Sequence, residues 1–178
     1  LSILSLEGAK VSAEISKLIR KYSTAQVAFE FIGDAALLYI PADENLEFAP
    51  IFSVYRAIDI VAVIMLGCLA QGILLRGGIG FGIGGFVEQS SFYGQAYYRA
   101  VAAEEEAKYP RVVVGASFLE YLDYLGDRAV HDKSLKTEEQ KLIMGWRSEV
   151  QRYLTKDTDD KCIVHYLRER HAKITEHD

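Results

Sequence analysis

The sequence predicts an α/β or α+β sandwich, because helix and strand patterns alternate along most of its length. Apolar residues recur at helical spacing in residues 6–22 and 48–69. Short runs rich in β-forming residues occupy residues 26–31, 35–40 and 111–114. Half of the 178 residues are hydrophobic and only three are proline, which leaves enough apolar mass for a packed core.

Charge and cysteine content exclude several classes of function. The net charge of −5 leaves no excess of Lys and Arg for a nucleic-acid or anionic-membrane surface, so we expect no nucleic-acid partner. Cys68 and Cys162 are far apart and form no CxxC pair, which argues against a disulfide scaffold and a zinc knuckle. No segment has the basic and apolar parts of a signal peptide, and the cytoplasm is the expected location.

The first elements are expected to be a helix and a hairpin. Residues 6–22 have the pattern of an amphipathic helix, and the runs 26–31 and 35–40 flank a Gly-Asp pair that favours a tight hairpin with Asp34 at its tip. A carboxylate there suits a Mg²⁺ ion that also takes phosphate oxygens. Aspartate is also common in turns for structural reasons, so both interpretations stay open.

Residues 48–69 are predicted to form a long buried helix. The longest apolar stretch, residues 51–75, is interrupted by Arg56, Asp59 and Gln71. Because a charge at the centre of a bilayer is unfavourable, we interpret the stretch as a core helix rather than a membrane span.

Residues 73–88 are rich in glycine, and bulky Ile79, Phe81 and Ile83 alternate with glycines. A period of two predicts a strand, and its bare face allows a ligand or another backbone to approach closely. The spacing from Gly80 also satisfies the dinucleotide motif GxGxxG, but no helix opens at its end, so we favour the strand. The P-loop and nucleophile-elbow motifs are absent from the sequence.

A third helix is expected over residues 93–108, after a turn at Ser90 and Ser91. Tyr109 and Pro110 end this helix, because proline cannot continue it. A short, fully apolar strand then begins at Arg111.

The C-terminal part is more polar. We expect a short helix over residues 117–125 with Ser117 as its N-cap, followed by a polar loop over residues 127–136. A Thr-x-x-Gln pattern opens a helix over residues 137–153. A charged turn then leads to a strand over residues 162–166.

Three segments, taken together, carry a more specific signal than any of them alone. Residues 29–35 read FEFIGDA, residues 75–82 read LRGGIGFG and residues 91–100 read SFYGQAYYRA. In this order and near this spacing they resemble the I-G-D hairpin, the glycine-rich strand and the helix start of class III nucleotidyl cyclases, and Glu104 fits the acidic residue that follows. With the closing residues 157–167, the chain looks most like the stand-alone bacterial anti-phage cyclases that make cyclic UMP or cyclic CMP.

The resemblance implies an α+β fold, in which a ferredoxin-like antiparallel sheet is packed with helices. It divides the chain into a cyclase-like catalytic part, residues 1–115, and a helical extension with a closing strand, residues 116–178, within the same domain. It also implies a homodimer, because sites in this family form between two head-to-tail subunits. The glycine-bearing segment 76–92 suits such a docking edge.

The implied reaction converts a nucleoside triphosphate to a 3′,5′-cyclic nucleotide and pyrophosphate, which we expect a separate effector to read. The related enzymes use two Mg²⁺ or Mn²⁺ ions between two aspartates, which lower the pKa of the ribose 3′-hydroxyl and grip the phosphates. Asp34 matches the second of these aspartates. The first, with its strand, is expected either upstream of Leu1 or to be absent from the protein, and Glu7 is the alternative within the chain.

Base choice in the resembled family depends on two positions, which here hold Glu30 and Ser91. Glu30 argues against adenine and is able to accept hydrogen bonds from guanine or from uracil, so the residue types leave purine and pyrimidine open. Tyr93 and Tyr97 are candidates to narrow the base pocket. The overall resemblance favours UTP or CTP.

Two further positions bear on the ribose and the α-phosphate. Tyr98 stands where the family has the asparagine that positions the ribose, and Ala102 stands where it has the arginine that stabilises charge on the phosphate. Arg99, or Arg76, is the candidate replacement for that arginine. Ion pairing of these arginines with the acidic residues 104–106 is the alternative.

Two hypotheses from other functional classes stay open. The chain is alternatively a cyclase-fold module that binds a nucleotide without turnover, which Tyr98 and Ala102 motivate. A purely structural interaction domain that uses residues 116–178 is the second alternative.

Overall fold

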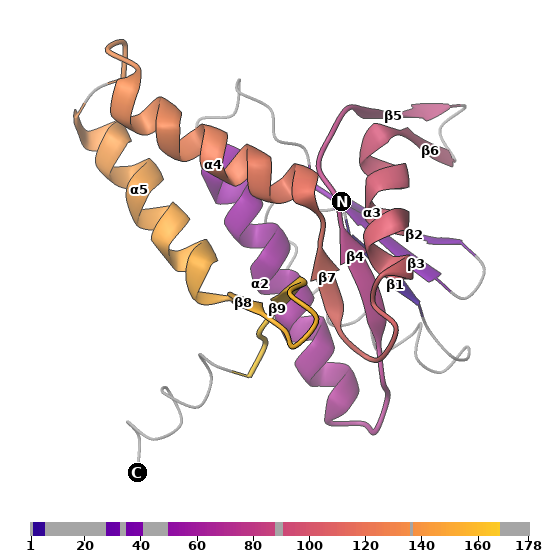
Figure 1. Cartoon of the computed structure of the whole chain (residues 1–178). Coiled ribbons are helices and arrows are strands. Elements are labelled where there is room, and N and C mark those ends of the chain that lie inside the picture. Colours follow the sequence, from indigo (N-terminus) through magenta and orange to yellow (C-terminus); the bar gives the residue numbers. More distant parts are fainter. Residues whose placement is uncertain are drawn as a thin grey trace.

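The computed structural model describes residues 2–5, 28–32, 35–40, 50–87, 91–135 and 137–167. In this part of the chain a seven-stranded sheet carries helices on both faces (Figure 1). The strands are β1 (Ser2–Ser5), β2 (Ala28–Ile32), β3 (Ala35–Tyr39), β4 (Arg76–Ile79), β5 (Gly84–Val87), β6 (Ser91–Gly94), β7 (Val112–Val114), β8 (Leu154–Lys156) and β9 (Cys162–Val164). The helices are α2 (Pro50–Leu69), α3 (Gln95–Glu105), α4 (Ala116–His131) and α5 (Thr137–Arg152).

The strand order β2-β3-β1-β4 forms one half of the sheet, and each neighbouring pair in it is antiparallel. With α2 between β3 and β4, this is the strand arrangement of a ferredoxin-like fold. The predicted α+β fold with a ferredoxin-like antiparallel sheet is therefore confirmed. Strands β7, β9 and β8 extend the sheet on the β4 side, and β7 runs parallel to β4.

The first strand corrects one expectation. A strand preceding the hairpin was expected upstream of Leu1, whereas the structure has β1 at Ser2–Ser5, between β3 and β4. Four residues are too short a run to show a period of two, so the sequence pattern did not identify this strand. The helix expected over residues 6–22 lies outside the described residues.

The predicted hairpin is confirmed, with β2 and β3 paired from Ala28–Tyr39 to Ile32–Ala35. Alternate side chains of β3 enter different cores. Leu38 packs with α2, whereas Leu37 packs with Ala100 of α3 on the opposite face of the sheet. The strand is buried on both sides because helices cover both faces of the sheet.

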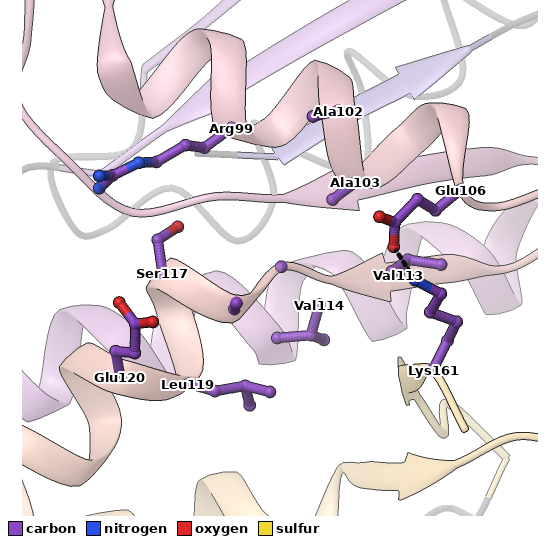
Figure 2. Close-up of a pocket in the computed structure, with 12 residues that line it drawn as sticks. Arg99, Ala102, Ala103, Glu106, Val113, Val114, Ser117, Leu119, Glu120 and Lys161 are labelled. Carbon is purple, nitrogen blue, oxygen red and sulfur yellow. Dashed lines mark hydrogen bonds and ion pairs between the residues drawn. The ribbon is translucent and has the colours of Figure 1, made fainter.

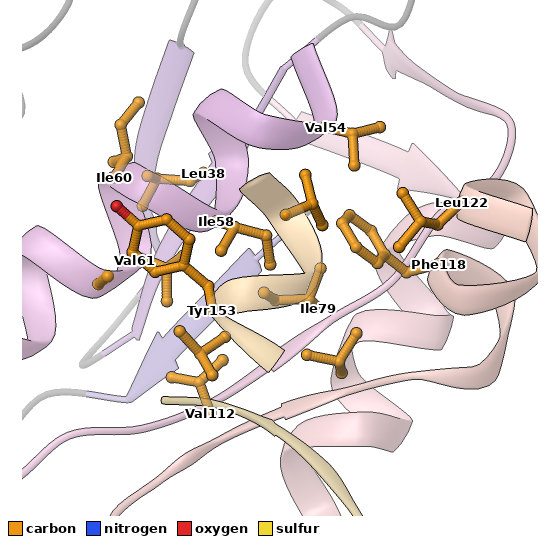
Figure 3. Close-up of a cluster of buried hydrophobic side chains, with 14 of the residues drawn as sticks. Leu38, Val54, Ile58, Ile60, Val61, Ile79, Val112, Phe118, Leu122 and Tyr153 are labelled. Carbon is orange, nitrogen blue, oxygen red and sulfur yellow. The ribbon is translucent and has the colours of Figure 1, made fainter. Parts of the chain in front are cut away.

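The predicted long helix is confirmed as α2, which supplies the centre of the main core (Figure 3). Ile58 and Val61 are completely buried and pack with Ile79 of the sheet and Phe118 of α4. Among the described residues, α2 is the one helix long and apolar enough to cross a membrane, and 56% of that stretch is buried inside the fold. This burial fits the interpretation as a core helix.

Helix α3 lies on the bare side of β4. A Cβ atom on Gly80 would stand 2.5 Å from the backbone nitrogen of Ala100, and one on Gly78 would overlap the carbonyl oxygen of the same residue. Only glycine permits a helix backbone to approach a strand this closely. The glycine face was predicted to admit a ligand or a backbone, and a backbone occupies it.

The prediction of one strand over residues 73–88 is wrong. The chain forms β4, leaves the sheet, and then forms β5, which pairs with β6 in a separate two-stranded ribbon. At the break, the backbone nitrogen of Phe81 donates to Ser117 Oγ of α4 at 3.1 Å instead of to a neighbouring strand. The helix expected from residue 93 begins later, at Gln95, so Tyr93 lies in β6.

Helix α4 is longer than predicted and runs to His131 instead of ending near residue 125. Its buried residues Leu122, Leu125 and Ala129 recur at helical spacing and pack in the main core, which stabilises the helix through the expected loop. Its N-cap is Gly115 rather than Ser117. The predicted helix over residues 137–153 is confirmed as α5, which lies beside α4 (Figure 1).

Candidate active site

Glu30 and Ser91, the residues expected from the sequence to read the base, lie in neighbouring parts of the fold. Glu30 of β2 is half-buried and pairs with Leu37, on the side of the sheet that α3 covers. Tyr39, from the same hairpin, stacks on Phe92 of β6 with ring centroids 5.2 Å apart and ring planes 17° apart. Burial and the nearby charge of Glu30 raise the pKa of Tyr39. This stack joins β3, the strand that pairs with the strand of Glu30, to β6, which begins with Ser91.

Arg76, at the start of β4, is held by the acidic residues of α3. Its Nε donates to Glu104 Oε1 at 2.5 Å, and the Arg76 side chain is 45% exposed. Arg76 therefore forms the ion pair that was one of its two expected roles. This contact fixes the C-terminal end of α3 against β4.

The tyrosines singled out from the sequence differ in exposure. Tyr93 and Tyr98 are 53% and 66% exposed, whereas Tyr97 is half-buried beside Leu37. Tyr98 meets Tyr97 edge-on, with ring centroids 5.7 Å apart. The side chain of Tyr98 is therefore largely in contact with solvent.

Arg99 takes a different partner from Arg76. Its Nη1 donates to the carbonyl oxygen of Phe81 at 2.9 Å, just beyond the end of β4. The guanidinium lies near the start of α4 and is exposed (Figure 2). A single bond to a carbonyl leaves the remaining N–H groups of the guanidinium able to contact an anion.

A cavity of about 490 Å³ opens between α3, β7, the start of α4 and the turn that joins β8 to β9. Its walls are largely apolar, and its polar groups are the side chains of Arg99, Glu106, Ser117, Glu120 and Lys161 (Figure 2). Ala102 also lines it. The volume lies in the range typical of small-molecule sites, about 300–1,000 Å³.

Lys161 is a site residue to which sequence reasoning assigned no role. It lies in the turn between β8 and β9, and its Nζ is 2.6 Å from Glu106 Oε2 of α3's C-terminal end. Its side chain is 41% exposed and lines the cavity. The only sequence signal was its place in the family-like closing segment, because the approach of the turn to α3 depends on tertiary packing.

Next to this pair lies a buried arginine. Arg111 is 3% exposed, and its guanidinium donates to Asp157 Oδ2 at 2.7 Å and to Asp159 Oδ2 at 2.6 Å. Tyr109 donates its hydroxyl to Asp157 at 2.5 Å, and its ring lies 4.2 Å below the guanidinium. Hydrogen bonds from Tyr109 and Arg111 lower the pKa of Asp157 to about 2, and those to Asp159 and Asp157 raise the pKa of Arg111.

The lowered pKa of Asp157 predicts an acid-dependent stability. An aspartate in an unfolded chain titrates near pH ~4. Because the folded pKa is about 2, the stabilisation is complete above pH ~4 and is lost as the pH falls toward 2. Thermal unfolding of the Asp157→Asn variant between pH 5 and pH 2 is expected to depend less on pH than that of the wild type. Parallel curves for the two proteins would contradict the assignment, and Asp160→Asn, in the same turn, serves as the control.

The metal ligand expected from the sequence, Asp34, lies outside the described residues, as does Glu7. Among the residues that the structure describes, no group of three or more His, Cys, Asp or Glu side chains is arranged to hold a metal ion. What the structure does show is the strand register next to Asp34: Ser5 at the end of β1 pairs with Ala35 at the start of β3.

No protein-family model and no curated protein matches the sequence. Two solved structures are similar to the fold. The guanylyl cyclase Cya2 is 14% identical, with a TM-score of 0.46, over 67% of this chain and 76% of that chain. The adenylyl cyclase CyaB from P. aeruginosa is 14% identical, with a TM-score of 0.44, over 69% of this chain and 79% of that chain. At these values neither likeness transfers an activity or a residue role to this chain.

Proposed function

We propose that the chain is a metal-dependent nucleotidyl cyclase that acts as a homodimer on a nucleoside triphosphate. The ribose 3′-oxygen loses its proton and forms a bond to the α-phosphorus, while the bond from the α-phosphorus to the bridging oxygen breaks and pyrophosphate leaves. Bound Mg²⁺ or Mn²⁺ would lower the pKa of the attacking hydroxyl and neutralise phosphate charge. We further propose that UTP or CTP is the preferred substrate and that the cyclic product is an anti-phage signal read by a separate effector.

The strand register at one end of the sheet carries this proposal. The last residue of β1, Ser5, is paired with the first residue of β3, Ala35. In the sequence, Asp34 directly precedes Ala35, and Glu7 follows Ser5 by two residues. The sequence thus supplies one carboxylate within two residues of each of these paired positions, a composition that suits an ion bound by one or two carboxylates and phosphate oxygens. We therefore propose Glu7 as the partner of Asp34.

The cations proposed for the phosphates are Arg99 and Lys161. Both line the cavity beside α3, which has the volume of a small-molecule site. Positive groups fixed near a phosphate stabilise the charge that develops as pyrophosphate leaves. Arg99 then supplies the charge that Ala102 lacks.

The spacing of these groups supports a site shared by two copies. Ser5 pairs with Arg76, the first residue of β4, whereas Arg99 bonds to Phe81, beyond the last residue of β4. A strand of this length spans about 10 Å, so the carboxylate end and Arg99 lie at opposite ends of β4. Head-to-tail pairing would bring the carboxylates of one copy to Arg99 of its partner.

For the base, we propose that Glu30 and Ser91 read the hydrogen-bonding edge. In support, the stacked rings of Tyr39 and Phe92 hold β3, the partner strand of Glu30, against β6, the strand of Ser91. Tyr93 is exposed and available for contact with the base, whereas Tyr97 is half-buried against Leu37.

The direct test is to incubate the full-length protein with each of the four nucleoside triphosphates and Mn²⁺ or Mg²⁺. We expect a 3′,5′-cyclic nucleotide, identified by mass spectrometry, and an equal amount of pyrophosphate, with UTP or CTP fastest. Asp34→Asn is expected to abolish turnover, and Asp127→Asn, an exposed aspartate on α4, is the control that keeps it. If no triphosphate gives a cyclic product or pyrophosphate, the proposed cyclase activity is contradicted.

A nucleotide-binding module without turnover is the second candidate. Exposed Tyr98 and Ala102 stand on α3 where the resembled family has its ribose-positioning asparagine and phosphate-stabilising arginine, and this observation favours it. Thermal stabilisation by a nucleotide without any product would support the module. Turnover by the wild type that Asp34→Asn abolishes would contradict it.

A further inference from the structure

The buried guanidinium of Arg111 makes three of the hydrogen bonds that fix the turn carrying Lys161 to the rest of the protein. Arg111 Nη1 donates to Asp157 Oδ2 at 2.7 Å and to Asp159 Oδ1 at 2.9 Å. Arg111 Nη2 donates to Asp159 Oδ2 at 2.6 Å and to the carbonyl oxygen of Glu106 at 3.1 Å. Because Arg111 immediately precedes β7, these bonds join the turn, the C-terminal end of α3 and the sheet.

Within the turn, the carboxylate of Asp159 and the backbone amide of Asp157 both reach the backbone of Lys161. The amide of Lys161 donates to Asp159 Oδ1 at 3.4 Å, and its carbonyl accepts from the amide of Asp157 at 2.9 Å. Asp159 therefore contacts both the guanidinium of Arg111 and the backbone of Lys161. A substitution at Arg111 or Asp159 should therefore shift the backbone of Lys161, through the chain of the turn and through the two hydrogen bonds to that backbone.

The side chain of Lys161 has a partner that a phosphate is able to replace. Its Nζ lies 2.6 Å from Glu106 Oε2, and the two side chains are 41% and 49% exposed. An ion pair this exposed contributes little to stability. A polyphosphate that enters the cavity offers Lys161 several negative oxygens in place of one carboxylate.

We propose that Arg111 is a positioning residue: through Asp157 and Asp159 it holds Lys161 at the mouth of the cavity, ready to bind the phosphates of the substrate. In the absence of substrate, Glu106 forms an ion pair with Lys161, and a phosphate of the substrate displaces this carboxylate. The assignment rests on the proposed function for the identity of the substrate. Its geometric basis, the anchored turn and the lysine at the cavity, does not depend on turnover.

The alternative is that Arg111 stabilises the fold and nothing else, and a double-mutant cycle on phosphate binding separates the two roles. The probe is inorganic tripolyphosphate, titrated by calorimetry into the full-length protein. Asp159→Asn and Lys161→Met are each expected to weaken binding by about tenfold, the range of one charge-assisted contact. The double variant is expected to bind no more weakly than Lys161→Met alone, because Asp159 acts through Lys161.

The control variants distinguish a positioning effect of Asp159 on tripolyphosphate affinity from the effect of its charge. Asp159→Asn removes a negative charge near the cavity, which by simple electrostatics would strengthen binding of an anion. Asp160→Asn removes the same charge from the same turn and is expected not to weaken binding. Glu106→Gln is expected to tighten binding by a few fold, because it frees Lys161, and Lys161→Arg is expected to retain binding.

The outcomes also separate this inference from the proposed function. One outcome is that the wild type binds tripolyphosphate with the expected coupling but forms no cyclic product from any triphosphate. This outcome would support the positioning role of Arg111 and contradict the proposed cyclase activity. Additive losses in the double variant, or an affinity unchanged by Asp159→Asn while Lys161→Met weakens it, would overturn the positioning role. Failure of the wild type to bind tripolyphosphate would overturn it as well.

Discussion

Replacing Gly78 with alanine is expected to destabilise the protein by about 3 kcal/mol, the upper end of the usual cost of overpacking. A Cβ atom at this position would overlap the carbonyl oxygen of Ala100 and the amide nitrogen of Glu104. Both are backbone atoms of α3, so no side-chain rotation relieves the overlap, and α3 has to move away from β4. Since Arg76 and the cavity both depend on the position of α3, the candidate site should be lost with the fold.

Urea unfolding followed by circular dichroism measures this effect, and the chain offers two matched controls. Cβ atoms on Gly85 of β5 and on Gly145 of α5 would meet nothing within 4 Å. Gly85→Ala is expected to be nearly neutral, and Gly145→Ala to stabilise the protein by about 0.5–1 kcal/mol, because alanine is the better helix residue. A midpoint for Gly78→Ala equal to that of Gly85→Ala would show that α3 does not pack on β4 in this way.

Arg99→Ala is expected to lower kcat by about 10²–10³, the usual cost of removing a group that stabilises charge in the transition state. The side chain is exposed and makes one bond to a backbone carbonyl, so the fold should tolerate the change. The measurement is kcat and KM for the best triphosphate, together with the unfolding midpoint. A fall in kcat with an unchanged midpoint identifies a role in the reaction.

The control for this experiment is Arg152→Ala. Arg152 is also exposed and pairs with Glu149 on α5, outside the elements that line the cavity. It is expected to leave kcat unchanged. An Arg99→Ala enzyme as active as Arg152→Ala would remove Arg99 from the proposed mechanism.

The elements that the sequence predicted well are those with a strong local pattern. The hairpin β2–β3 follows from two runs of β-forming residues around a Gly-Asp pair, and α2 follows from a long apolar stretch. The close approach of a backbone to Gly78 of β4 and to Gly80 just after it was also among the predictions, because glycines leave this face without side chains.

The elements that were predicted wrongly depend on partners distant in the sequence. The alternation over residues 73–88 continues through a point where the chain leaves the sheet, because Phe81 bonds to Ser117 of α4 rather than to a strand. Helix α4 extends to His131 because Ala129, in its last turns, is buried in the main core. Neither partner is visible in a local window of sequence.

For the site, the sequence by itself determined which residue types are present and which segments carry them: Asp34 in the hairpin, Glu30 in the preceding strand and Arg99 in α3. Tertiary structure decided which of these residues meet. It paired Arg76 with Glu104, opened a cavity between Arg99 and Lys161, and fixed the turn of Lys161 through buried Arg111. The physical reason is that side-chain identity and local period are encoded residue by residue, whereas hydrogen bonds and cavities form between segments that only the packed sheet and helices bring together.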